Sequence, residues 1–263
     1  MSGRHRAALV TGGGTGIGAA VARRLAADGW RVAVTGRRRE PLEEVAAETG
    51  GLALVSDTTV AADAEAAVAE AVAAFGGLDG LVLNAGIGGA GSLLDADPAR
   101  FEEVVRVNLV GPFLVARAAV RHLLASGGAI VTVASDAGLV AGPSSLAYCA
   151  SKAGLVHLTR CMALDHGPQG VRANCVCPGW VRTPMADGEM DVLGAALGVD
   201  REDAYATVTR DVPARRPSRP EEIAAAVVWL LSPESSYVNG ATLAVDGGSS
   251  VVDVAATAFG ALA

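Results

Sequence analysis

The sequence predicts an α/β fold, in which helices cover both faces of a doubly wound parallel sheet of about seven strands. Short apolar runs alternate with helical patterns along the whole chain, as is typical of parallel sheets. A glycine-rich turn joins the first apolar run to the first helical pattern. Hydrophobic residues make up 51% of the chain and charged residues 19%, which suffices for a large core. No linker interrupts the alternation, so residues 1–263 are expected to form one domain.

The predicted strands are apolar runs short enough to be fully buried. They are Ala7–Thr11, Arg31–Thr35, Leu52–Val55, Leu81–Leu83, Ala129–Ala134, Val171–Cys177 and Thr242–Val245. Helices are predicted over Ala19–Asp28, from about Ala61, over about Pro98–Leu124, around Tyr148 and over Pro220–Leu231. Residues 184–219 are the least regular stretch, and such an excursion beside a site is often a lid.

The turn after the first strand reads Gly12-Gly13-Gly14-Thr15-Gly16-Ile17-Gly18. Glycines between a strand and a helix let backbone N–H groups approach a pyrophosphate at the helix N-terminus. The alternative is an ordinary glycine-rich turn. The strand–turn–helix context favours nucleotide binding.

Gly36 directly follows the second predicted strand, at the place where a dinucleotide fold often carries an acidic residue that binds the ribose hydroxyls. Arg37 and Arg38 follow, and a guanidinium can bind a 2′-phosphate through two charge-assisted hydrogen bonds. We therefore expect NADP(H) to be preferred, with NAD(H) as the alternative. Asp57, after the third strand, either accepts from the adenine amino group or caps the helix that starts near Ala61.

Ser135, Tyr148 and Lys152 form the predicted catalytic group. Ser135 ends a predicted strand, and the four-residue spacing places Tyr148 and Lys152 on one helix face. A phenol has a pKa near 10, and a neighbouring ammonium would lower it. Tyr148 would then act as a general acid or base while Ser135 binds the substrate oxygen. Otherwise these residues are a buried tyrosine, a solvated lysine and a loop serine.

Two further polar positions accompany this group. Asn84-Ala85-Gly86 ends the fourth predicted strand. Asn108 lies inside an apolar helical stretch and needs hydrogen-bond partners there. It is either a structural polar plug or part of a proton relay.

Composition excludes several classes of partner. A net charge of −7 and a pI of about 5.1 disfavour binding to nucleic acid or to an anionic membrane. The apolar run that follows Arg6 ends within a few residues, too soon for a signal peptide, so a cytoplasmic location is expected. Cys175 and Cys177 lack the spacing of a zinc site, and no metal is expected.

Taken together, the residues resemble the short-chain dehydrogenase/reductase family, in its short single-domain branch, from about Leu9 to Gly248. The resemblance rests on motifs in family order: Thr11-Gly12-x-x-x-Gly16-x-Gly18, Asn84-Ala85-Gly86, Asn108, Ser135, Tyr148-x-x-x-Lys152 and Pro178-Gly179. It implies a Rossmann-type fold that binds NAD(P). Ala134 stands where serine is frequent, and Asp136 is a carboxylate beside the carbonyl site that points either to solvent or to the substrate.

The resemblance also implies residue roles. Tyr148 would be the acid/base, Lys152 would lower its pKa, Ser135 would orient the carbonyl, and Asn108 would hold a water of the relay. Cofactor contacts would come from Gly12, Thr15, Gly16, Ile17, Gly18, Arg37, Arg38, Asp57, Asn84, Ala85, Gly86, Tyr148, Lys152, Pro178, Gly179, Val181 and Thr183. Family members are commonly homotetramers or dimers built on the helices that contain Asn108 and Tyr148.

The expected function is the interconversion of a small-molecule ketone or aldehyde with an alcohol, using NADP(H). The alternatives are an NAD-linked secondary alcohol or diol dehydrogenase and a catalytically silent NADP-binding regulatory subunit. The lid at 184–219 and the loop Leu139–Leu146 are expected to set the substrate. Arg210, Arg215 and Arg216 would either meet an anionic substrate or lie on the surface.

Overall fold

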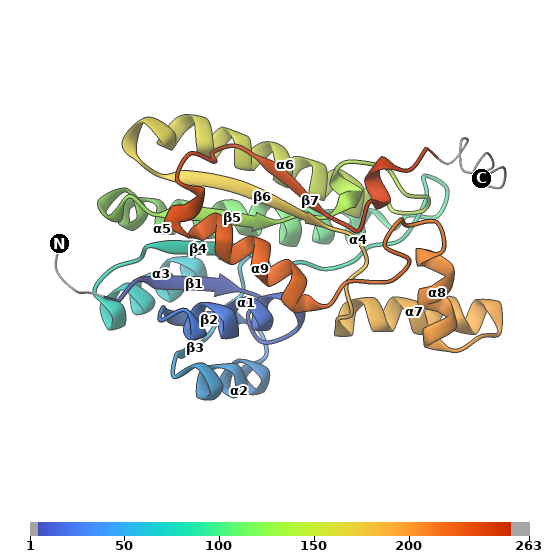
Figure 1. Cartoon of the computed structure of the whole chain (residues 1–263), viewed down its shortest axis with the longest axis horizontal. Coiled ribbons are helices and arrows are strands. Elements are labelled where there is room, and N and C mark those ends of the chain that lie inside the picture. The colour runs from blue at the N-terminus through green and yellow to red at the C-terminus, as the bar shows by residue number, and fades with distance from the viewer. Residues whose placement is uncertain (1–4, 254–263) are drawn as a thin grey trace.

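Seven parallel strands form one sheet in the computed structural model, which describes residues 5–253 (Figure 1). They are β1 (Ala7–Thr11), β2 (Arg31–Gly36), β3 (Leu52–Val55), β4 (Gly80–Leu83), β5 (Ala129–Val133), β6 (Arg172–Pro178) and β7 (Thr242–Val245). Their order across the sheet is β3-β2-β1-β4-β5-β6-β7, and every neighbouring pair is parallel. The predicted Rossmann-type sheet is confirmed, and strand boundaries differ from the predicted ones by at most one residue.

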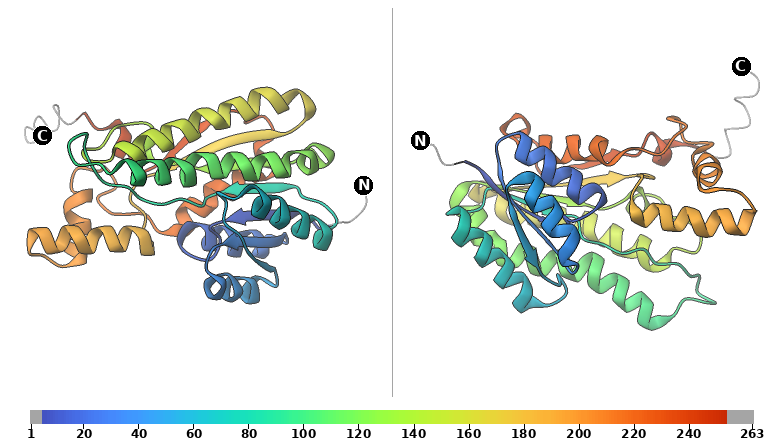
Figure 2. Two further views of the ribbon diagram at one scale, coloured as in Figure 1. Left: turned by 180° about the vertical axis from the view of Figure 1, so that it is seen from behind. Right: turned by 90° about the horizontal axis from the view of Figure 1, so that it is seen from below.

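Helices cover both faces of this sheet (Figure 2). They are α1 (Gly16–Ala27), α2 (Arg39–Thr49), α3 (Ala61–Phe75), α4 (Pro98–Val105), α5 (Gly111–Ser126), α6 (Leu146–His166), α7 (Pro184–Leu197), α8 (Arg201–Thr209) and α9 (Pro220–Leu231). Residues of α1, α2 and α9 pack in one apolar cluster with one face of the sheet, and residues of α3, α5 and α6 pack against the other face.

The alternation of side chains along β1 explains how one continuous apolar strand packs against the helices on both faces of the sheet. Ala8 and Val10 join the cluster on the α1 side, whereas Ala7 and Leu9 join the cluster on the α3 side. Successive strand residues point to opposite faces, so a strand covered on both sides must be apolar at every position. All five residues of β1 are buried.

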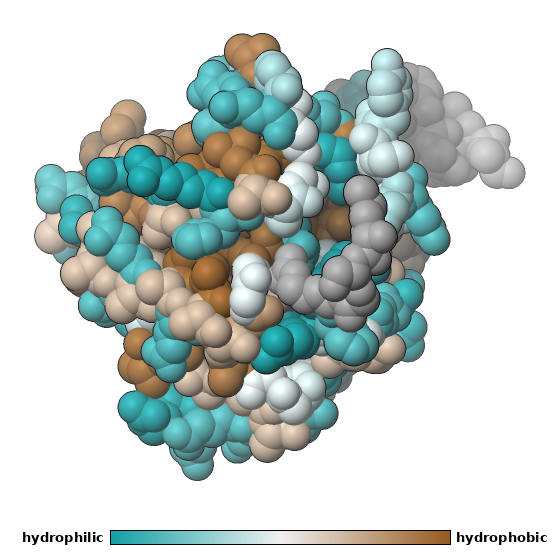
Figure 3. Space-filling view, turned by 90° about the vertical axis from the view of Figure 1, so that its left-hand side faces the viewer, coloured by the Kyte–Doolittle hydropathy of each residue, from teal (hydrophilic) through white to brown (hydrophobic). Residues whose placement is uncertain are grey.

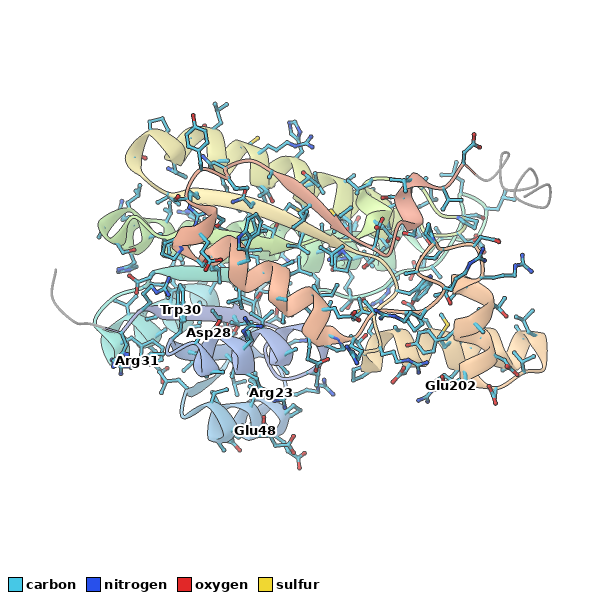
Figure 4. The ribbon with its side chains drawn as sticks, in the orientation of Figure 1. Arg23, Asp28, Trp30, Arg31, Glu48 and Glu202 are labelled. Carbon is cyan, nitrogen blue, oxygen red and sulfur yellow. The ribbon has the colours of Figure 1, made fainter. Side chains whose placement is uncertain are left out.

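Surface contacts hold the helices at the β2–β3 side of the sheet. Arg23 of α1 donates to Glu48 of α2, and the guanidinium of Arg31 lies 4.5 Å from the centroid of the Phe75 ring (Figure 4). Figure 3 shows the end of the molecule at which the strands begin. There, hydrophilic side chains are mixed with smaller apolar areas. Exposed ion pairs of this kind contribute about 0–1 kcal/mol each, so the two apolar clusters carry most of the stability.

The prediction that residues 184–219 are irregular is wrong, because they contain α7 and α8. Thr183 caps α7 by accepting from the Ala186 N–H, and Asp200 caps α8 by accepting from the Asp203 N–H. The two helices pack together through a small apolar cluster that includes Met190. Gly188 and Gly194 inside α7 weaken its sequence pattern, since glycine disfavours a helix interior.

The predicted helix over 98–124 is interrupted. A π-helical turn, Arg106–Val110, separates α4 from α5 and contains the buried Asn108. Such turns are rare and occur mostly at functional sites. Two other boundaries moved: α1 starts at Gly16, three residues before the predicted start, and Pro178 is the last residue of β6.

The strand order places a crevice at the carboxyl edge of the sheet. From β1 the chain winds outward to β3 and then returns to β4 on the other side of β1. The loops that follow β1 and β4 therefore diverge, and open α/β sheets bind ligands at this switch point. No helix among the described residues is long and apolar enough to cross a membrane.

Candidate active site

A cleft of about 310 Å³ opens at this switch point. Thirteen of the seventeen predicted cofactor residues line it: Gly12, Thr15, Gly16, Ile17, Arg37, Arg38, Asp57, Asn84, Ala85, Gly86, Tyr148, Lys152 and Thr183. The cleft thus runs from the glycine-rich turn, past the end of β2, to the first turn of α6. Its size and concave shape are those of a small-ligand site.

The shape of the glycine-rich turn lets a ligand approach its backbone closely. Gly12 and Gly16 adopt φ values of +62° and +54°, which side-chain-bearing residues rarely adopt. The side chain of Asn84 donates to the carbonyl oxygens of Thr11 and Gly12 at 3.0 and 3.2 Å, which ties the turn to the end of β4. The first residues of α1 face the cleft, so its free N–H groups can bind a phosphate. This cradle fits the pyrophosphate of a dinucleotide.

Four predicted cofactor residues do not line the cleft. A Cβ on Gly18 would lie 2.2 Å from the Gly12 oxygen, so Gly18 acts from behind the turn by letting α1 pack closely. Val181 is buried in the core on the α1 side of the sheet. Pro178 ends β6 beside β7, and Gly179 packs against the backbone of Asp246.

Arg37 and Arg38 border the other end of the cleft, next to Asp57. Burial opposes ionisation of Asp57, but hydrogen bonds from Thr59 and the charges of Arg37 and Arg106 outweigh it and lower the pKa of the carboxyl group. Asp57 Oδ1 accepts from both the N–H and the hydroxyl of Thr59, at 2.9 and 2.8 Å. Asp57 therefore orders the turn before α3 and is not the residue that caps this helix, which is Val60.

Ser135, Tyr148 and Lys152 meet at the inner end of the cleft. Lys152 Nζ is buried, lies 5.6 Å from the centroid of the Tyr148 ring, and donates to the Val133 carbonyl at 3.1 Å. Ser135 Oγ donates to Asp136 Oδ1 at 3.0 Å and accepts from the Ala137 N–H at 3.2 Å. The three predicted side chains are thus assembled as their spacing required.

The expected lowering of the Tyr148 pKa is not what the structure gives. Burial raises the pKa of Tyr148 to about 12, a hydrogen bond with Ser135 opposes the rise, and the charges of Glu189 and Asp136 add to it. Burial also lowers the pKa of Lys152 to about 8. The physical reason is that the helix face that brings the two groups together also withdraws both from water, and desolvation disfavours each charged form.

Asn108 has every side-chain group engaged. Its Nδ2 donates to the Ile87 carbonyl at 2.9 Å and to Ser151 Oγ at 3.1 Å, and its Oδ1 accepts from the Ile87 N–H at 2.8 Å. These contacts fit the structural role, and the part in a proton relay stays a prediction. Asn108 fixes the loop after β4 against α6, next to the cleft.

Some cleft residues were missed from the sequence. They are mostly apolar or small residues: Gly14, Gly36, Pro41, Leu42, Ser56, Thr58, Ile87, Val107, Val133, Ala134, Pro184 and Met185. Their residue types do not indicate a binding site in the sequence, although their places at strand ends do. Within residues 5–253, no group of three or more His, Cys, Asp or Glu side chains is arranged to hold a metal ion.

Comparison with known proteins agrees with this geometry. The family model described as enoyl-(acyl carrier protein) reductase matches residues 12–250. The chain belongs to the short-chain dehydrogenase/reductase family. It is 44% identical to "Protein MoaE" of Klebsiella aerogenes over 97% of this chain and 99% of that protein. It is 40% identical to 2-(S)-hydroxypropyl-CoM dehydrogenase 3 of Xanthobacter autotrophicus, over 95% of this chain and 98% of that one.

Solved structures give the same result. The crystal structure of actinorhodin polyketide ketoreductase with NADPH superimposes with a TM-score of 0.90 at 34% identity, covering 96% of this chain and all of that chain. The protein is therefore an NAD(P)-dependent oxidoreductase of this family that acts on the alcohol and carbonyl groups of small molecules. The expectation of an enzyme is confirmed, and the alternative of a silent regulatory subunit is set aside.

Proposed function

We propose that this enzyme interconverts a ketone or aldehyde with an alcohol, with Tyr148 as the general acid/base in a site completed by Ser135, Lys152 and Asn108. The observation that carries the proposal is the position of Tyr148. It lines the same cleft as the glycine-rich turn and lies beside Ser135 and over Lys152. A proton donor and a nucleotide cradle in one cleft are what hydride-transfer chemistry needs from a protein.

The protein's own residues supply the proton and the orientation. In reduction, the Tyr148 hydroxyl donates its proton to the carbonyl oxygen as that oxygen gains negative charge. Ser135 Oγ turns its proton from Asp136 to the same oxygen and holds it against the phenol. In oxidation both proton movements reverse. The nicotinamide cofactor, when bound, donates or accepts the hydride.

The raised pKa of Tyr148 suits its role as general acid in the reductive direction. A phenol with a pKa of about 12 is protonated at neutral pH, which is the form that can donate to a carbonyl oxygen. Lys152 supplies positive charge 5.6 Å from the ring centroid, and this charge favours the phenolate that remains after donation. Its bond to the Val133 carbonyl holds the ammonium in place. Asn108 would act less directly, by fixing the loop after β4.

We further propose that NADP(H) is preferred over NAD(H). Arg37 and Arg38 border the cleft where β2 ends, and Gly36 presents no carboxylate to bind ribose hydroxyls or to repel a 2′-phosphate. The guanidinium groups of Arg37 and Arg38 are available to bind this phosphate, because neither residue has an ion pair among the described residues. Asp57, which lines the cleft beside them, is proposed to meet the adenine.

Three predictions about the larger context remain proposals. The exposed apolar side chains of Phe101 on α4, Phe113 on α5 and Leu164 on α6 support a homodimer or homotetramer built on these helices. The helices α7 and α8 are proposed to form the substrate lid within one catalytic domain. Four unpaired cysteine thiols are compatible with a reducing, cytoplasmic location.

Replacing Tyr148 tests the proposed function. Tyr148→Phe keeps the ring and removes the proton, so kcat should fall by about 10²- to 10⁴-fold. The dissociation constant of NADPH should change little, and fluorescence titration measures it independently of turnover. A broad panel of ketones, ketoacyl thioesters and secondary alcohols supplies the substrate. A Tyr148→Phe protein with near wild-type kcat would refute the assignment.

A further inference from the structure

Glu189 of α7 is an acidic side chain at the substrate end of the cleft. It lies one helical turn after Met185, which lines the cleft. Its carboxylate rests on the loop after β4: a Cβ placed on Gly88 would lie 2.8 Å from Glu189 Oε1. Ile87, the neighbour of Gly88, also lines the cleft. The lid helix therefore brings a carboxylate to the rim of the reaction site.

This carboxylate has no partner within residues 5–253, whereas the acids around it do. Asp187, two residues earlier on α7, accepts from the Tyr205 hydroxyl at 2.8 Å. Asp191, two residues later, forms an ion pair with Arg201 at 2.7 Å. No hydrogen bond or ion pair in the described chain engages Glu189, which is exposed at the surface of α7, although the protein around its carboxyl group excludes enough water to raise the pKa of this group. It is thus an acceptor left free for a ligand.

The other carboxylate near the reaction site is already occupied. Asp136 accepts from Ser135 Oγ at 3.0 Å and from Ser249 Oγ at 2.7 Å. The charges of both Asp136 and Glu189 raise the pKa of Tyr148, and the ammonium of Lys152 lies 5.6 Å from the centroid of its ring. Of these two carboxylates, Glu189 is the one that no hydrogen bond or ion pair engages among the described residues.

The arginines that might have bound an anionic substrate lie elsewhere. Arg216 forms an ion pair with Glu222 at 2.6 Å, and Arg210 forms one with Asp211 at 3.5 Å. Arg215 is exposed, and none of these three arginines lines the cofactor cleft. The surface alternative is thus the one that the structure supports for Arg210 and Arg215, whereas Arg216 lines a second cavity of about 280 Å³. A cation does lie at the loop after β4, beside Glu189: Arg100 donates to the Gly88 carbonyl at 2.7 Å and forms an ion pair with Glu103 at 2.6 Å.

We propose that Glu189 is a specificity-determining residue that binds an ammonium group of the substrate, so that the enzyme acts on amino alcohols and the corresponding aminoketones. The inference rests on the proposed function, because Tyr148 defines where the reacting carbon lies. A partly desolvated carboxylate gains most from a cationic donor, since a charge-assisted hydrogen bond is stronger than a neutral one. A hydroxyl-bearing substrate offers the weaker, neutral bond.

A matched substrate panel tests this inference. Each secondary alcohol carries, one to three methylenes from the carbinol carbon, an ammonium, hydroxyl, methyl or carboxylate group; the shortest set is 1-amino-2-propanol, 1,2-propanediol, 2-butanol and 3-hydroxybutyrate. In at least one chain length, kcat/KM should be about tenfold higher for the ammonium compound than for the methyl compound, and lowest for the carboxylate. For compounds that are not turned over, calorimetry in the presence of NADP⁺ compares their dissociation constants in the same order.

Variants link the preference for ammonium compounds to Glu189. Glu189→Gln should reduce the ratio of kcat/KM for the ammonium compound to kcat/KM for the methyl compound to near one. Glu189→Asp should retain part of this preference. Glu65→Gln, at an exposed glutamate of α3, is the matched control and should leave the ratio unchanged. The inference is overturned if the hydroxyl, methyl or carboxylate compounds equal or exceed the ammonium compounds at every length, or if Glu189→Gln keeps the full ratio. Failure of the proposed function is distinct: the ammonium compounds would still bind best, but no alcohol would be oxidised.

Discussion

Ser249 Oγ donates a hydrogen bond of 2.7 Å to Asp136 Oδ2, which joins the turn after β7 to the loop that carries the proposed catalytic serine. The other oxygen of Asp136 accepts from Ser135 at 3.0 Å. Ser249 also lies 3.3 Å from Asp246 Oδ2, and this carboxylate in turn accepts from the Ser250 N–H at 2.9 Å. The orientation of the Ser135 hydroxyl therefore depends on a segment near the end of the described chain.

Ser249→Ala should lower turnover without weakening cofactor binding. It leaves Asp136 with one partner and lets its carboxylate rotate, so Ser135 is oriented less well. A hydrogen bond to a charged group contributes about 1.5–3 kcal/mol, and loss of about half of that in the transition state would lower kcat roughly three- to tenfold. Steady-state kinetics and NADPH titration measure the two effects. Ser236→Ala, at an exposed serine with no role in this network, is the control; equal kcat values for the two variants would contradict the prediction.

The negative charges near Tyr148 predict a pH effect. Glu189, Asp136 and Cys149 each raise the pKa of Tyr148, beyond the larger effect of burial, and Ser135 lowers it. Alcohol oxidation requires the phenolate as base, so kcat/KM should rise with pH through this pKa. Glu189→Gln removes one negative charge and lowers the pKa. The rise should then move to lower pH by roughly half to one unit, since about 1 kcal/mol of charge interaction is somewhat less than one unit.

A neutral substrate such as 2-butanol keeps that pH profile free of substrate charge. Because a pKa of about 12 lies above the range of the measurement, the profile is recorded on its rising limb, from about pH 6 to about pH 10, where a shift to lower pH appears as a higher kcat/KM at each pH. Glu65→Gln should leave the profile where it is in the wild type. A shift of the Glu189→Gln profile to higher pH would show that the charge acts with the opposite sign, or that another group limits the rate.

The fold was predictable because its signals are local and repeated. Fully apolar runs such as Ala7–Thr11 carry the two-sided burial of a parallel strand, and the glycines from Gly12 to Gly18 mark the turn after it. That Ser135, Tyr148 and Lys152 come together was predictable because their residue types, spacing and places at element ends all agree. The helices α7 and α8 were missed because they are stabilised by packing on each other, which a residue pattern with internal glycines does not reveal.

The pKa of Tyr148 could not be predicted from the sequence for a different reason. A lysine one helical turn from a tyrosine suggests a lowered pKa for the phenol, but the balance depends on how deeply both groups are buried. Glu189 and Asp136, which raise the pKa of Tyr148, come from separate elements that only the folded chain brings together. The π-helical turn around Asn108 is likewise invisible in an apolar helical pattern.

The proposed cofactor preference should be reversible by substitutions at the end of β2. In wild type, kcat/KM should favour NADP(H) over NAD(H) by roughly ten- to a hundredfold, since a charge-assisted hydrogen bond to the 2′-phosphate contributes about 1.5–3 kcal/mol. The double variant Gly36→Asp/Arg37→Ala should invert this ratio. A Cβ at Gly36 would lie 3.6 Å from Leu42 Cδ2, an ordinary contact, so aspartate fits there. Wild-type preference for NAD(H), or an unmoved ratio in the double variant, would overturn the prediction.

Arg39→Ala is the matched control for the cofactor experiment. Arg39 is exposed, forms an ion pair with Glu43 at 3.3 Å and does not line the cleft. Its removal should leave the ratio of kcat/KM values within about twofold, as for other surface changes away from a site. The comparison separates a specific phosphate contact by Arg37 from the general positive charge of this segment.

The proposed lid, α7 with α8, should move as one body, because these helices are held to each other more closely than to the sheet. The Tyr205 hydroxyl donates to Asp187 at 2.8 Å, and Arg182, before α7, forms an ion pair with Glu202 of α8, which lies at the outer end of the molecule (Figure 4). Met190 and Tyr205 are buried in the cluster between them. We therefore expect amides of both helices to exchange with one common opening free energy, lower than that of the sheet.

Hydrogen exchange with and without NADP⁺ and substrate tests this behaviour. Both helices should become more protected together when the ligands are present, while the amides of β5 change little. Tyr205→Phe removes the bond to Asp187, which contributes about 1.5–3 kcal/mol as a hydrogen bond to a charged group. Without ligands, it should therefore speed exchange of α7 and α8 about ten- to a hundredfold and leave α3 unaffected. Equal protection of 184–219 in the free and liganded protein would rule out the lid, and faster exchange of α8 alone in the variant would show that the two helices do not move as one body.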